Sequence, residues 1–76
     1  MKITYDPEAD ALYIQLRSVR PADSFDLQEG VTADVDDAGH IIGIEILDAR
    51  QQLGDEALTS VSVEQLLATP RETARR

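Results

Sequence analysis

Apolar and polar residues alternate with a period of two in four separate stretches of this sequence. These stretches cover residues 2–5, 12–16, 31–36 and 42–47. A period of two places every second side chain on one face of a β-strand, so each stretch is typical of a strand with one buried face. Each is also rich in β-branched or aromatic residues, which suit a pleated surface. The pattern predicts a sheet of about four strands within residues 1–47.

The connections favour antiparallel neighbours. Residues 6–10 place Pro7 where it starts a type I turn, and residues 36–39 end in a glycine suited to a left-handed conformation. The second of these patterns predicts a hairpin with a bulge. Residues 17–30 are too long for a tight turn, and alternation around Phe25 indicates that part of them is extended. We therefore expect a meander.

The C-terminal third has helical signals. Asp48 followed by Gln51 has the spacing of a capping box, and Gly54 is suited to end a short helix. A second such signature begins at Ser62, and Pro70 stops that helix. The expected fold class is α+β: one domain over residues 1–69, with a sheet (1–47), a helical segment (48–69) and a mobile basic tail (70–76).

The predicted strands have two unlike faces. One is apolar throughout, and we expect short C-terminal helices carrying Leu53, Leu66 and Leu67 to cover it. That face comprises Ile3, Tyr5, Leu12, Ile14, Val31, Val35, Ile42, Ile44 and Ile46. The other face is mixed and carries Tyr13, Ile41 and Leu47, which form a candidate interface. Scattered exposed apolar residues are also ordinary on protein surfaces, so both interpretations stay open.

The chain has 76 residues and no cysteine. A core this small gives thin stability, and no disulfide supplements it, which favours self-association or a partner. Neither a signal peptide nor a run of about 20 apolar residues is present, so we expect a cytoplasmic protein that does not enter a membrane.

The formal net charge is −8, and it is unevenly distributed. Residues 1–70 carry fourteen acidic and four basic residues (−10), whereas residues 71–76 carry three arginines and one glutamate (+2). Direct nucleic-acid binding is disfavoured, because phosphates require clustered Lys and Arg. A basic protein would be attracted, although plain solubility also explains the charge.

Carboxylates are the only abundant groups with chemical potential. The single histidine, His40, does not make a metal cluster and has no nucleophile at catalytic spacing, so we assign no catalytic residue, metal ligand or cofactor. Hard cations do take oxygen ligands of the kind that Asp6, Asp10, Asp34 and Glu45 offer. Turn aspartates equally bind their own backbone amides, and that structural explanation stays open beside the cation site.

Two strings carry a resemblance to a known family. They are Tyr5-Asp6-Pro7-Glu8-Ala9-Asp10-Ala11-Leu12-Tyr13-Ile14 and, after Gly30-Val31, the stretch from Gly39 to Asp48. Over residues 1–50 the chain resembles the prokaryotic domain-of-unknown-function family DUF2283. The matching residues are Tyr5, Asp6, Asp10, Leu12, Tyr13, Gly39, Gly43, Glu45 and Leu47.

The resemblance implies a small antiparallel sheet domain with no established activity. It also implies a place beside small toxin-like proteins of the ribonuclease type, and so an antitoxin-like role. Among the matching residues, four are polar and form a candidate functional cluster: Asp6, Asp10, Tyr13 and Glu45.

Two functions are indicated by the sequence. The first is a non-enzymatic protein-interaction module that forms a homodimer or binds and neutralises a basic partner protein. The alternative is an acidic-face binder of a cation or small ligand, with hydrolytic chemistry as its furthest extension.

Overall fold

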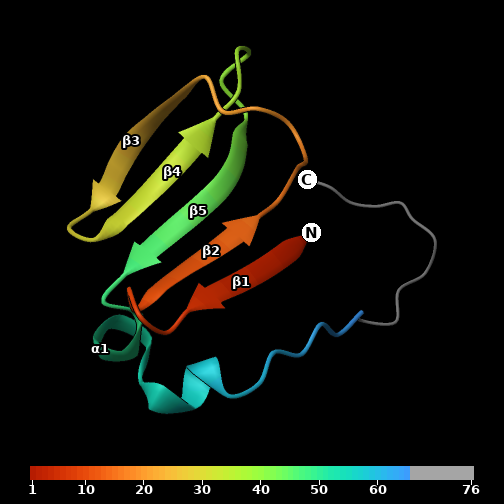
Figure 1. Cartoon of the computed structure of the whole chain (residues 1–76). Coiled ribbons are helices and arrows are strands. Elements are labelled where there is room, and N and C mark those ends of the chain that lie inside the picture. Colours follow the sequence, from red (N-terminus) through yellow and green to blue (C-terminus); the bar gives the residue numbers. More distant parts are fainter. Residues whose placement is uncertain (66–76) are drawn as a thin grey trace.

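The computed structural model describes residues 1–65, which form a five-stranded antiparallel sheet followed by a short helix and a 3-10 turn (Figure 1). The strands are β1 (Lys2–Asp6), β2 (Ala11–Gln15), β3 (Asp23–Gln28), β4 (Val31–Val35) and β5 (Ile41–Leu47). The helix α1 spans Ala49–Leu53, and the 3-10 turn η1 spans Asp55–Leu58. The α+β class predicted from the sequence is confirmed.

The sheet has one strand more than expected, and its order is not that of a simple meander. The order is β1-β2-β5-β4-β3, so β2 pairs with β5 rather than with the strand that follows it (Figure 1). The extra strand, β3, comes from the segment around Phe25. The order is explained by β5, which has the densest run of isoleucines. In the centre of the sheet its side chains meet apolar neighbours from β2 and β4.

The register assigns the side chains to the two faces as the alternation predicts. Ile44 lies between Ile14 on β2 and Ala33 on β4, and Ile46 lies between Leu12 and Val31. Residues directly opposite in an antiparallel pair share a face, so these side chains form one continuous apolar face. Its buried part is small: among hydrophobic residues only Ala33, Val35, Ile42 and Ala49 are buried in the described chain. The core therefore sits mainly between β4 and β5.

The cover of the apolar face differs from the expectation. Helix α1 lies at one end of the sheet, beside the end of β5, and not across the face (Figure 1). Leu53 is 42% exposed, and Phe25 on the edge strand β3 is 53% exposed. Residues 61–65 are not helical, and the rest of the second predicted helix, with Leu66 and Leu67, lies outside the described residues, as does the basic tail.

The hairpin between β4 and β5 is confirmed. Gly39 has the left-handed φ expected of it (+88°), and a register shift between Asp34 and Val35 marks a further bulge between β4 and β5, outside the turn. The Asp36 carboxylate accepts hydrogen bonds from the backbone N–H groups of Ala38 (3.0 Å) and His40 (2.8 Å). The His40 ring is exposed and contacts Asp36 at 3.1 Å, so the only histidine belongs to this turn.

Candidate functional site

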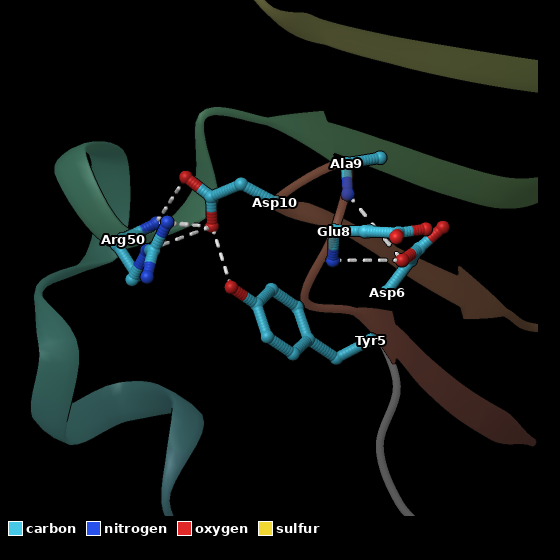
Figure 2. A network of polar contacts seen from close by, with 6 residues as sticks. All are labelled: Tyr5, Asp6, Glu8, Ala9, Asp10 and Arg50. Atoms are coloured by element: carbon cyan, nitrogen blue, oxygen red, sulfur yellow. Dashed lines mark hydrogen bonds and ion pairs between the residues drawn. The ribbon is translucent and has the colours of Figure 1, made fainter.

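Asp6 and Asp10 lie on either side of the turn between β1 and β2 (Figure 2). The Asp6 carboxylate accepts from the backbone N–H groups of Glu8 (3.0 Å) and Ala9 (3.3 Å), which closes the turn locally. Asp10 ends the turn with φ +53°, a left-handed conformation that aspartate tolerates better than most residues. Asp6 therefore has a structural role within its own loop.

Asp10 connects this turn to the start of α1. Its backbone oxygen accepts from Ala49 N–H at 3.0 Å, and its carboxylate accepts from Arg50 N–H at 3.2 Å. These are two of the N–H groups that a helix start leaves without an internal partner. The same carboxylate accepts the Tyr5 hydroxyl at 2.6 Å and lies 3.4 Å from the Arg50 Nε atom (Figure 2). A carboxylate distant in sequence thus caps the helix.

The capping box predicted at Asp48 and Gln51 is wrong. Asp48 adopts a left-handed conformation with φ +51°, and its side chain makes no capping hydrogen bond. The sharp bend there turns the chain from β5 into α1 and brings the helix start to Asp10. This contact cannot be predicted from local sequence spacing, because Asp10 and Arg50 are 40 residues apart.

The side chain of Gln52 fastens the same helix to a second turn. Its side-chain amide nitrogen donates to the backbone carbonyl oxygens of Glu29 (3.3 Å) and Leu47 (3.2 Å). Nothing in the sequence pattern singles out Gln52, and its role was not predicted. Helix α1 therefore holds the β1–β2 turn and the β3–β4 turn together at one end of the sheet.

Tyr13 lies on the mixed face and crosses β5. Its hydroxyl donates to the Asp34 carboxylate on β4 at 2.9 Å, and its ring passes over Gly43. A Cβ atom at position 43 would overlap the Tyr13 hydroxyl. Burial, and then the bond to Asp34, raise the pKa of the Tyr13 hydroxyl, which therefore stays protonated and donates. Glu45 lies directly opposite Tyr13 in the register.

The four residues of the candidate polar cluster are divided between separate places. Tyr13 and Glu45 are neighbours in the middle of the mixed face, and Asp34 joins them. Asp10 bonds Tyr5, whose register partner Leu12 belongs to the apolar face, and Asp6 bonds its own turn. Within residues 1–65 no three His, Asp or Glu side chains are arranged to hold a metal ion.

The pKa values of Asp10 and Asp36 are lowered because their carboxylates accept hydrogen bonds from neighbouring groups of the protein. The hydrogen bond from the Tyr5 hydroxyl, followed by that from Arg50 N–H, lowers the pKa of Asp10. The His40 N–H does the same for Asp36, whose pKa is also lowered. A carboxylate that accepts several hydrogen bonds favours its ionised form. Both groups are therefore charged at neutral pH and occupied with neighbouring donors.

An apolar groove of about 440 Å³ runs along the β1 edge of the apolar face. Residues from the sheet form one wall, and η1 with the chain that follows it forms the other. The lining residues are Met1, Ile3, Tyr5, Leu12, Ala57, Leu58, Val61 and Val63. Val61 and Val63 are 63% and 86% exposed, so the second wall is itself open to solvent. The sequence did not predict this groove, because its pattern favours a helix from Ser62 onward, whereas residues 61–65 are not helical.

The interface suggested at Tyr13, Ile41 and Leu47 is spread along the sheet. Leu47 and Ile41 are exposed at opposite ends of β5. Tyr13 is half-buried, and its hydroxyl donates a hydrogen bond to Asp34. The bulge places Ile41 opposite Val35, a residue of the apolar face. This interface stays a prediction.

Comparison with known proteins gives one match. The family model described as "Protein of unknown function (DUF2283)" matches residues 2–50, which is more than half of the chain. No curated protein and no solved structure matches significantly. The matched region ends at Arg50, the residue whose N–H and side chain meet Asp10. In the part of the chain that the structure describes, no helix is long and apolar enough to cross a membrane.

Proposed function

This chain belongs to the DUF2283 family, and we propose that it is a non-enzymatic protein-interaction module that binds a basic partner protein. The observation that carries the proposal is the apolar sheet face, which is exposed along its two edge strands, β1 and β3, in the described residues. Phe25, Leu27 and Ile3 are all exposed, and the groove continues this surface at the β1 edge. Exposed apolar patches of this kind mark interaction surfaces.

The energetics favour a covered face. Burial of apolar surface contributes about 25 cal/mol per Å², so each large side chain left exposed forgoes about 1.5–3 kcal/mol. A domain with four buried hydrophobic residues in its described part has little other source of stability. A partner that covers this face would therefore stabilise the domain as well as bind it.

The charge favours a basic partner over a second copy. Residues 1–65 hold fourteen acidic and four basic residues, and Arg17 and Arg50 lie within ion-pair distance of Asp36 and Asp10. Two chains of net charge −8 repel each other, whereas a cationic protein is steered to the surface. Such binding would neutralise a toxin-like partner by covering the basic surface with which it binds RNA.

The proposal is tested by recovering the partner and reconstituting the complex. The chain, tagged and expressed at low level in its native host, is purified, and the intact complex is identified by native mass spectrometry. We expect one stoichiometric protein of positive net charge, and an association rate between the purified components that falls steeply with added salt. Recovery of monomer or homodimer alone, or an association rate insensitive to salt, would contradict the proposal.

A further inference from the structure

The geometry points to the groove along β1 as the docking site for an apolar partner segment that carries Lys or Arg at one end. This inference rests on the proposed function and specifies which part of the apolar face holds the partner. The groove offers apolar side chains on two walls, Ile3 and Leu12 on the sheet and Leu58 and Val61 opposite. A segment lying between these walls would be buried on two sides.

The apolar lining of the groove favours apolar side chains in the part of the segment that lies inside it. Among the lining side chains none is charged, and only Tyr5 carries a hydroxyl. That hydroxyl is already bonded to Asp10 at 2.6 Å. A polar side chain placed in the groove would lose water without gaining a free side-chain partner there, and this disfavours polar occupants.

The charges around the groove are distributed asymmetrically. Asp55 and Glu56 directly precede the lining residues Ala57 and Leu58. The pKa of the lining residue Tyr5 is raised mainly by its hydrogen bond to Asp10, and the negative charge of Asp55 is close enough to add to this rise. The basic residue Lys2 lies at the other end, where β1 begins (Figure 1). Glu64, which directly follows the lining residue Val63, adds one further negative charge beside the groove. The occupant is therefore oriented, with its Lys or Arg side chains beside Asp55 and Glu56.

Arg50 does not remove this preference. Arg50 is the basic residue beside Tyr5, and its Nε atom lies 3.4 Å from Asp10, with which it is paired. Asp55 and Glu56 are exposed, and no salt bridge to them is formed within residues 1–65. A fatty acid or another anionic amphiphile would bring its carboxylate against these two side chains, which disfavours it.

Defined peptides test the site independently of the partner's identity. The probe is a short peptide with a run of Leu and with Lys at one end, compared with the same peptide in which Glu replaces Lys, and with laurate as an anionic amphiphile. Binding to the full chain is followed by titration calorimetry at low salt. We expect the Leu/Lys peptide to bind at least tenfold more tightly than the Leu/Glu peptide, and laurate to bind no more tightly than the Leu/Glu peptide.

Matched variants locate the binding. The double substitution Val61→Ser and Val63→Ser removes apolar surface from two exposed positions, so the fold should persist, and we expect the affinity to fall roughly tenfold. Val19→Ser, at a position that is 44% exposed and does not line the groove, is the control and should leave affinity unchanged. Asp55→Asn with Glu56→Gln should weaken binding several-fold at low salt, and Asp37→Asn with Glu29→Gln should not.

Each outcome bears on a definite claim. Equal affinity of the groove variant and the Val19→Ser control, or tighter binding of laurate than of the Leu/Lys peptide, overturns the docking site. If the native partner still binds the groove variant as tightly as it binds the wild type, the inference about the groove fails while the proposed function stands. If no partner binds the wild-type chain, the proposed function itself fails.

Discussion

At the scale of single residues, the Tyr13 side chain occupies the space that a Cβ atom at Gly43 would need. Glycine in a central strand costs stability, because it has no side chain to pack. Here the missing side chain leaves the space through which Tyr13 reaches Asp34 on the next strand but one. The glycine at position 43 is thus explained by the tyrosine at 13.

Substitution of Gly43 tests this directly. Gly43→Ala places a methyl group against the Tyr13 hydroxyl, so we expect a loss of about 1–3 kcal/mol in the free energy of unfolding, measured by urea denaturation. In a Tyr13→Val background the space is empty, and the same substitution should then be neutral or stabilising, since alanine loses less backbone entropy than glycine. Equal costs in the two backgrounds would show that Tyr13 is not the cause.

The hydroxyl of Tyr13 can be tested apart from its ring. Tyr13→Phe keeps the packing over Gly43 and removes the hydrogen bond to Asp34. We expect a loss of about 0.5–1.5 kcal/mol in the free energy of unfolding, the net contribution of one such bond. If Tyr13→Phe costs as much as Tyr13→Val, the ring packing contributes nothing and the explanation of Gly43 needs revision.

At the scale of elements, the start of α1 depends on a residue from the other end of the chain. A helix of five residues is too short to form on its own in water. Its position is held by Asp10 at the β1–β2 turn and by its own Gln52, whose amide donates to the Glu29 carbonyl oxygen at the β3–β4 turn. The family resemblance located Asp10 from the sequence, but its partner Arg50 became visible only in three dimensions.

A matched pair of substitutions separates the observed cap from the one predicted by spacing. Asp10→Asn and Asp48→Asn remove the same charge at two positions with similar left-handed backbone angles, which asparagine tolerates. We expect Asp10→Asn to lower the thermal unfolding midpoint by about 3–6 °C and Asp48→Asn to change it by less than about 2 °C. A larger fall in the midpoint for Asp48→Asn than for Asp10→Asn would show that Asp48, and not Asp10, caps the helix.

Acid should unfold the domain partly through the turn carboxylates. The pKa values of Asp10 and Asp36 are lowered in the folded state, so in acid the unfolded chain binds protons more readily than the folded chain. Their contribution is complete above a pH of about 4, the pKa of an unfolded aspartate, and is lost as the pH falls below it.

The urea midpoint measured from pH 7 to pH 2 checks this dependence. We expect a plateau above about pH 5 and a decline below about pH 4. The Asp10→Asn, Asp36→Asn double variant should start from a lower plateau and decline less steeply. An identical acid slope in the wild type and the variant would assign the acid sensitivity to other carboxylates.

At the scale of the whole molecule, the alternation of apolar and polar residues predicted the faces of the sheet, whereas the connections between strands did not predict the strand order. The apolar set of the strands was correct except at Ile41, which the bulge places opposite Val35, because a period of two fixes which side chains share a face, whatever the strand order. The pairing of β2 with β5 could not be read locally, since it depends on the competition of all strands for the central place. The second face was likewise predicted as mixed, but the bond between Tyr13 and Asp34 needed the register.

The groove shows why the candidate site was harder to predict than the fold. The capping signature at Ser62 favoured a helix, yet residues 61–65 are not helical, and Val61 and Val63 face the sheet side chains across the groove. Local propensity is a weak guide where few tertiary contacts are made. The consequence for function is that an acidic domain with a small core carries exposed apolar side chains at the edges of its apolar sheet face.

The most direct test of the proposed function compares the proteins that wild-type and groove-variant chains retain when purified from the native host. The chain, the Val61→Ser, Val63→Ser variant and the Val19→Ser control are expressed at equal levels and examined by native mass spectrometry. We expect one basic partner bound stoichiometrically to the wild type and to the control, and largely lost from the groove variant. A chain that is recovered alone in all three cases would contradict the proposal.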